Sequence, residues 1–295
     1  MTDKSQRTSR FARYVLPAAL TALAASYTVM LSFVSLWYEG AYSPDSLVYV
    51  NTAQNLLAGK GLAVSVVWLT EPLESSPVPP QPMQGWGPLY PALIALMALT
   101  GLSAACAALA VPLLLLPLIL AGAYFAAREF YGKAAAMLVV GALLHFDPLR
   151  YVTVHAWSEN TALVCHFWFL CLAARVGNGK GSWGTAAGAG LLAGLATIGR
   201  FAFLPLIGIA LLSLIPLARN RRQAALHYFA CLSAFALIVL PVLAHNAFFA
   251  DRAQSAPDSY FRTHKLAAVK FVGDGFFESF VPDHWLLRIL YAACL

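Results

Sequence analysis

The chain has 295 residues, of which 60% are hydrophobic and only 11% are charged, and its mean hydropathy is +0.69. This composition excludes an ordinary water-soluble domain and indicates a protein that crosses a membrane several times. The net charge of +6 comes without a basic stripe of interleaved aromatic residues, so we expect no nucleic-acid partner. The five cysteines form no Cys-x-x-Cys pair and lie in apolar runs, which favours a packing role.

The N-terminal segment, residues 1–13, carries four Lys or Arg side chains and precedes an apolar run over residues 14–37. That run is long enough to span a hydrocarbon core of roughly 30 Å, so we expect a cytoplasmic tail followed by a retained membrane span. A cleaved signal peptide would have a shorter apolar region, and Gly40-Ala41 leaves that alternative open.

Residues 38–103 are predicted to form the first outer loop. Pro44 and Asp45 suit the first turn of an amphipathic helix on the outer surface, which Gly59 or Gly61 would end. A carboxylate beside a bilayer is costly unless it faces water, a partner or a substrate. Asp45 therefore has two compatible interpretations, as the cap of this helix or as a catalytic carboxylate at its entrance that accepts a proton.

The apolar stretch 88–102 has about fifteen residues, fewer than the ~20 needed to cross a bilayer. We expect a juxtamembrane or re-entrant helix here. Tyr90 lies near its start and suits either the membrane interface or a substrate contact.

Six further apolar stretches are predicted to cross the membrane: residues 104–127, 134–154, 157–176, 185–198, 201–218 and 224–249. Gly190 and Gly194 form a Gly-x-x-x-Gly face that favours close helix packing. Residues 250–284 are predicted to form a second large outer loop. The last apolar run, 285–295, is too short to cross, which indicates a truncated chain or a short relative of a longer protein.

The distribution of charge sets the predicted orientation. If residues 88–102 do not cross, the inner segments carry 11 of the 19 Lys and Arg residues and only two of the 13 acids. This arrangement follows the positive-inside tendency and places the N terminus in the cytoplasm. The predicted fold is all-α, a polytopic transmembrane helix bundle of one domain over residues 1–295, with an outer loop that bears juxtamembrane helices.

Ionisable residues recur at the predicted outer ends of these spans, at Asp147, Arg150, His155, Glu159 and Arg200. If the chain is helical from residue 155 onward, His155 and Glu159 share a face with His166. That face could hold a divalent metal ion, or it could make hydrogen bonds to other helices. Arg200 suits a phosphate, whose oxygens match the guanidinium, or else lipid headgroups.

Several segments, taken in order, resemble the GT-C class of integral-membrane glycosyltransferases. The resemblance is closest to the branch of the dolichyl-phosphate-mannose-protein mannosyltransferases and aminoarabinose transferases, and it covers about residues 14–220. It is carried by Asp45-Ser46, the run from Ala53 to Leu62, the run from Gly87 to Leu93, Ser158-Glu159, and the run from Gly190 to Arg200.

The resemblance implies an inverting transferase in a membrane that we expect to be the bacterial inner (plasma) membrane. Such enzymes move a sugar from a polyprenyl-phosphate carrier to a lipid, glycan or protein acceptor at the outer face. By this resemblance Asp45 matches the catalytic base. The candidate site comprises Asp45 and Glu159 as catalytic residues, with Arg200, Arg150, Lys60, His155 and Tyr90 around the carrier phosphate and substrate.

Two alternatives to catalysis stay open at this point. The chain could be a degenerate, non-catalytic relative of the transferases, or it could transport a lipid or solute. A transporter would place its charged residues near the midplane and often shows inverted repeats, whereas these charges gather at one surface and no repeat is evident.

Overall fold

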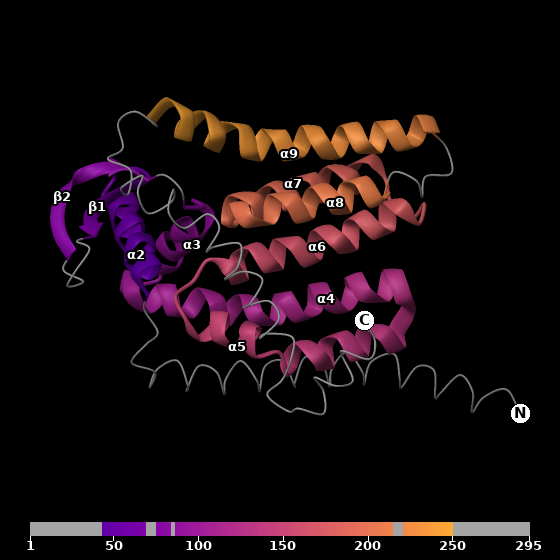
Figure 1. Cartoon of the computed structure of the whole chain (residues 1–295), viewed down its shortest axis with the longest axis horizontal. Coiled ribbons are helices and arrows are strands. Elements are labelled where there is room, and N and C mark those ends of the chain that lie inside the picture. Colours follow the sequence, from indigo (N-terminus) through magenta and orange to yellow (C-terminus); the bar gives the residue numbers. More distant parts are fainter. Residues whose placement is uncertain (1–42, 69–74, 84–85, 215–220, 250–295) are drawn as a thin grey trace, which may run out of the picture. The chain divides into compact units, whose positions relative to one another are not determined.

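The computed structural model describes residues 43–68, 75–83, 86–214 and 221–249 (Figure 1). The chain divides into two compact units, Met1–Phe248 and Phe249–Leu295, and nearly all described residues belong to the first. The predicted tail 1–13, the first span 14–37, the second outer loop 250–284 and the last apolar run lie outside the described residues.

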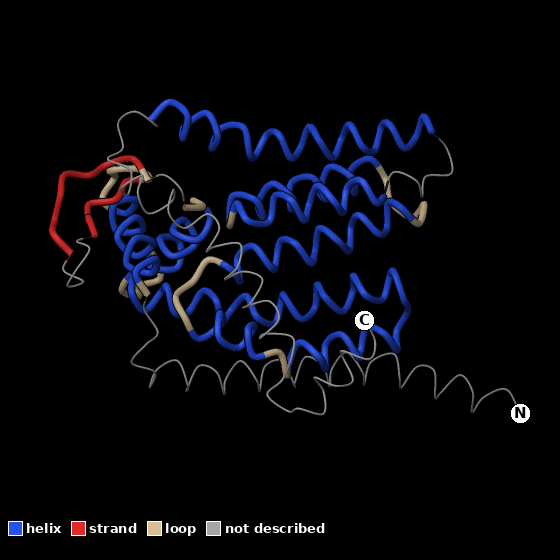
Figure 2. Tube along the Cα trace, in the orientation of Figure 1, coloured by secondary structure: helices blue, strands red, loops and turns tan. Residues whose placement is uncertain are grey.

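The described residues are mostly helical, as predicted (Figure 2). Three helices are long and apolar enough to cross a membrane, over Ala104–Leu144, Glu159–Gly177 and Arg222–Asn246, which supports the prediction of a membrane protein. The helices in chain order are α2 (Pro44–Leu57), α3 (Leu89–Ala98), α4 (Ala104–Leu144), α5 (Asp147–Val154), α6 (Glu159–Gly177), α7 (Trp183–Gly199), α8 (Leu204–Leu214) and α9 (Arg221–Phe249), with a 3₁₀ turn, η1 (Phe201–Phe203), before α8.

The all-α prediction was wrong for the segment after α2, which forms a two-stranded antiparallel sheet of β1 (Ala63–Trp68) and β2 (Ser75–Pro82). The β-branched residues of β1 suit a strand, and the prolines of β2 fit an edge position. Two asparagines one turn apart on α2 hold the sheet. The Asn55 side chain donates to the Ala63 carbonyl (2.8 Å), and Asn51 accepts from the Ser65 amide (2.6 Å).

Helix α4 consists of two arms that meet at Gly132. A straight helix of its 41 residues would be about 60 Å long, twice the thickness of a bilayer core. Gly132 has φ 87° and ψ −179°, a backbone conformation that glycine adopts readily and other residues rarely do. The chain reverses direction there (Figure 1). This reversal lies between the predicted spans 104–127 and 134–154, where a connection was expected.

The predicted span 134–154 is broken into the second arm of α4 and the separate helix α5. The break lies at His145 and Phe146, just before Asp147 and Pro148. Pro148 has no N–H with which to continue the ladder of the preceding helix, but it is tolerated in the first turn of a new one. The predicted span ran past this stop, although polar residues and Pro148 interrupt the apolar pattern there.

Helix α7 packs against α9 through the predicted Gly-x-x-x-Gly face. A Cβ atom on Gly190 would collide with the backbone carbonyl of Cys231, and one on Gly194 would lie 2.8 Å from the Ile238 Cβ. Both helices therefore approach more closely than any side chain at these positions would allow.

Gly190→Ala is expected to destabilise the protein by about 1–3 kcal/mol, because the obstructing atom is backbone and the helices must separate. Gly184→Ala in the same helix is the matched control. Its Cβ would meet only the Ser182 Oγ, at 3.6 Å, so stability should hold or rise slightly. Thermal unfolding in mild detergent measures both, and equal midpoints for the two variants would contradict this packing.

Candidate functional site

The first turn of α2 is held by Ser43. Its Oγ accepts from the Ser46 amide (3.3 Å), and the Ser46 hydroxyl accepts from the Ser43 amide (2.9 Å) in a capping box. Pro44 follows at a position that needs no amide hydrogen. The interpretation of Asp45 as the helix cap is therefore wrong, and its carboxylate remains available for another role.

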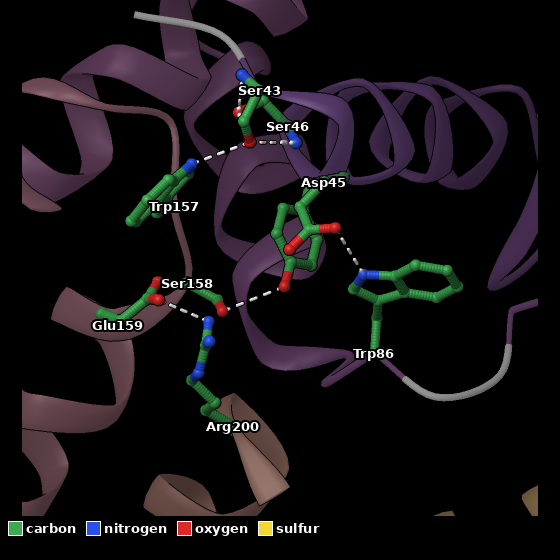
Figure 3. A network of polar contacts seen from close by, with 9 residues as sticks. Ser43, Asp45, Ser46, Trp86, Trp157, Ser158, Glu159 and Arg200 are labelled. Carbon is green, nitrogen blue, oxygen red and sulfur yellow. Dashed lines mark hydrogen bonds and ion pairs between the residues drawn. The ribbon is translucent and has the colours of Figure 1, made fainter. Parts of the chain in front are cut away.

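Asp45 is exposed and lies beside Trp86, which precedes α3 (Figure 3). The indole Nε1–H donates to Asp45 Oδ1 over 3.3 Å. The contact uses only one of the two carboxylate oxygens, so it orients the group and leaves the second oxygen for a solvent or substrate proton.

Two hydrogen bonds attach α2 to the segment that enters α6. Trp157 Nε1–H donates to Ser43 Oγ (2.7 Å), and the Tyr49 hydroxyl is 3.0 Å from Ser158 Oγ. Tyr49 lies one turn after Asp45, and Ser158 directly precedes Glu159. These bonds therefore fix the position of Asp45 relative to Glu159.

Tyr49 also lies close to every charge of the site. Burial raises its pKa to about 12 against the lowering effect of the Ser158 hydrogen bond, and the charges of Asp45, Glu159 and Arg200 all act on it. Tyr49 stays protonated at neutral pH and is unsuited to act as a base there, which leaves that role to a carboxylate.

Glu159 and Arg200 form an ion pair between the start of α6 and the end of α7. Arg200 Nη1 lies 2.5 Å from Glu159 Oε1 (Figure 3). The acid lies deeper than the cation, since 18% of the Glu159 side chain is exposed against 40% for Arg200. Glu159 Oε2 is buried without a hydrogen-bond partner in the structure. In this pair the Arg200 side chain is therefore partly accessible to solvent, whereas the Glu159 carboxylate is largely buried.

Glycines let the backbone approach this ion pair. A Cβ on Gly199 would lie 3.3 Å from the Ala162 amide nitrogen of α6. A Cβ on Gly87 would collide with the carbonyl groups of Ile198 and Gly199. The loop before α3, the end of α7 and the start of α6 are thereby pressed together, which brings Trp86, Arg200 and Glu159 to the same end of these helices.

The predicted helical face of His155, Glu159 and His166 is wrong at its first member. His155 has φ −101° and ψ 152°, so it precedes α6 on extended backbone. It is buried, its Nδ1 is 2.6 Å from the Tyr151 carbonyl, and its ring stacks against Tyr151 and Trp157. In the part of the chain that the structure describes, no three His, Cys, Asp or Glu side chains gather as a metal site.

The other predicted phosphate ligands lie apart from the ion pair. Arg150 binds Asp147 at 3.0 Å, three residues earlier on α5, and both side chains are well exposed. Lys60 is exposed beyond the end of α2, whose 14 residues place it about 20 Å along the helix axis from Asp45. Arg200 is therefore the predicted cation that the structure brings to the acids.

Tyr90 was predicted near the phosphate, but the structure buries it completely. Its hydroxyl donates to the Ala108 carbonyl (2.6 Å), and its ring packs edge-on against Tyr49 at 5.1 Å. Pro112 lies four residues after Ala108 and has no N–H, so this carbonyl lacks its ordinary helical donor. Tyr90 supplies the missing hydrogen bond.

Four residues of the site were not predicted from the sequence: Ser43, Tyr49, Trp157 and Ser158. The Ser43-Pro44-Asp45-Ser46 order was a signal for the serine cap, but the other partners depend on contacts across more than 100 positions. Comparison with known proteins adds no assignment: no family model, curated protein or solved structure matches the chain. The geometry of these residues is therefore the basis for the functional proposal.

Tyr90→Phe is expected to destabilise the protein by about 1–3 kcal/mol, because it leaves the Ala108 carbonyl buried without its donor. Tyr131→Phe removes a hydroxyl from a side chain that is 78% exposed and should change stability by less than about 0.5 kcal/mol. Thermal unfolding in detergent compares the two. Unchanged stability in Tyr90→Phe would contradict a structural role for the Tyr90 hydroxyl.

Proposed function

We propose that the chain is a membrane glycosyltransferase of the GT-C type. It moves a sugar from a polyprenyl-phosphate carrier to an acceptor hydroxyl outside the cytoplasm. The proposal rests on one observation: an exposed carboxylate, Asp45, lies in the same cluster of polar contacts as a cation, Arg200, that a second carboxylate holds. The resemblance in the order of the sequence motifs, from Asp45 to Arg200, agrees with this arrangement.

In the proposed reaction Asp45 is the general base. Its exposed carboxylate accepts the proton of the acceptor hydroxyl while that oxygen attacks the anomeric carbon. The bond between this carbon and the carrier phosphate breaks, and the phosphate leaves with the electron pair, which inverts the anomeric centre. Trp86 orients the base through Oδ1, so the other oxygen is the one that takes the proton.

Arg200 is the group that we propose binds the carrier phosphate. Its side chain is 40% exposed, and the guanidinium contacts Glu159 through one nitrogen, so donors remain for an anionic ligand. Positive charge beside the departing phosphate lowers the barrier by stabilising the charge that develops there. Glu159 acts in this scheme as a positioning residue, because its ion pair holds the Arg200 side chain in place.

The length of α6 supports the membrane arrangement that we propose. Its 19 residues span about 28 Å, close to the thickness of a bilayer core. We place the end with Asp45, Glu159 and Arg200 at the outer surface of a multi-pass protein, with the N terminus in the cytoplasm. A lipid-linked phosphate, which stays at headgroup level, can reach a cation at that depth.

Asp45→Asn is expected to lower kcat for sugar transfer by about 10²–10⁴-fold, because the amide cannot accept the proton. The measurement is transfer from a polyprenyl-phosphate sugar by the full chain in vesicles. Asp147→Asn makes the same change in a carboxylate on α5 that pairs only with Arg150 in the described structure, and it should retain activity. Equal rates for wild type and Asp45→Asn would remove the proposed base and favour a non-catalytic protein or a transporter.

Arg200→Gln is expected to raise KM for the donor by about 10–100-fold, through the loss of one or two charged hydrogen bonds, and to lower kcat as well, because the leaving phosphate loses its stabilising charge. Arg200→Lys should recover only part of this, since an ammonium lacks the planar fork that matches phosphate. Arg150→Gln and Lys60→Gln remove cations that lie apart from the ion pair, and their donor KM should stay near that of wild type. A larger effect of either one than of Arg200→Gln would move the phosphate site.

A further inference from the structure

Two connections meet at one end of the helices, opposite to the start of α6 and the end of α7 (Figure 1). One is the reversal of α4 at Gly132, and the other is the short link from α6 to α7. Asn178 in that link donates to the Glu129 carbonyl (3.1 Å), and Lys180 forms an ion pair with the Glu129 carboxylate (3.0 Å). These contacts fasten the two connections to each other.

One cation contacts this single acid and two more lie close enough to act on it electrostatically. The charges of Lys180, Arg175 and Arg128 all act on Glu129, and those of Arg175 and Arg128 also reach Cys171. All three side chains are exposed. Of the ion pairs in the described ranges, only the one with Lys180 involves these cations. The contacts thus assemble a basic patch, Arg128, Arg175 and Lys180, with an excess of positive charge.

Exposed aromatic residues flank the basic patch. Trp183, which begins α7, is 72% exposed, and Tyr131 beside the reversal is 78% exposed. The Arg128 guanidinium lies 5.9 Å from the centre of the Phe125 ring. Trp and Tyr with apolar bodies and polar edges are enriched at the headgroup level of membranes. The patch therefore has the composition of a surface that meets lipid headgroups.

We propose that the basic patch is a binding site for the phosphodiester headgroup of an anionic phospholipid. Arg128 of α4, Arg175 in the last turn of α6 and Lys180 in the link after it can bind one phosphate together, and the aromatic residues would lie at the depth where the acyl chains begin. About 28 Å of α6 separates the patch from the Glu159 end, so this lipid belongs to the opposite leaflet. The proposal does not depend on sugar transfer.

The test uses the full chain in phosphatidylcholine nanodiscs that contain a small fraction of phosphatidylglycerol brominated on its acyl chains. Bromine quenches nearby indoles, so enrichment at the patch should quench Trp183 more than brominated phosphatidylcholine does at the same fraction. The signal of Trp183 is obtained as the difference from Trp183→Phe. Each cation removed should lower the enrichment about fivefold, and the triple change Arg128→Gln, Arg175→Gln, Lys180→Gln about a hundredfold.

Three controls decide the outcome. The charge-preserving change Arg128→Lys with Arg175→Lys should keep the enrichment, which separates lost charge from misfolding. Arg150→Gln with Lys60→Gln removes two cations from the other end and should leave it unchanged. Inorganic phosphate at matched ionic strength should not displace the lipid. Equal quenching by both lipids, retention in the triple variant, or displacement by phosphate would each overturn the proposal.

Discussion

The ion pair between Glu159 and Arg200 is the interaction on which the arrangement at this end of the helices depends. It joins the first residue of α6 to the residue that ends α7, two neighbours that run in opposite directions. Glu159 is the more covered partner, and one of its oxygens is buried without a hydrogen bond. A covered carboxylate is costly unless a cation compensates it, so Glu159 requires Arg200 more than Arg200 requires Glu159. This asymmetry leaves the cation available to a second anion.

The pair could not form at this distance without small residues in the surrounding backbone. Gly87 and Gly199 allow the loop before α3, the end of α7 and the start of α6 to touch, and Gly190 brings α9 against α7. The close approach supplies dispersion contacts, and it also fixes the helix ends from which the site side chains project. In this protein the glycines act on the site through helix position, although none of them carries a functional group.

Much of this could be predicted from the sequence, and the failures have physical causes. Hydropathy located the long apolar helices, because a run of about 20 apolar residues is itself the signal of a helix that can cross a membrane. Pro44 and Gly59 marked the two ends of α2. The gathering of Asp45, Glu159 and Arg200 at one end followed from counting crossings. The hydrogen-bond partners within the site could not be predicted, because the Tyr49–Ser158 and Trp157–Ser43 bonds join residues far apart in the chain. Tyr90 was misplaced since nothing local shows that Pro112 leaves a carbonyl without its donor.

The two ends of α6 carry opposite chemistry, and this bears on how the protein sits in a membrane. At one end exposed Asp45 and the Glu159–Arg200 pair combine two acids with one cation, whereas at the other Glu129 faces three cations. An anionic leaflet attracts the second end and not the first. The contacts of Asn178 and Lys180 with Glu129, which lie at the basic patch, also hold the α4 reversal against the α6–α7 link. Because α6 and α7 run between the two ends, a lipid bound at the basic patch would contact the same helices that carry Glu159 and Arg200 at their far ends.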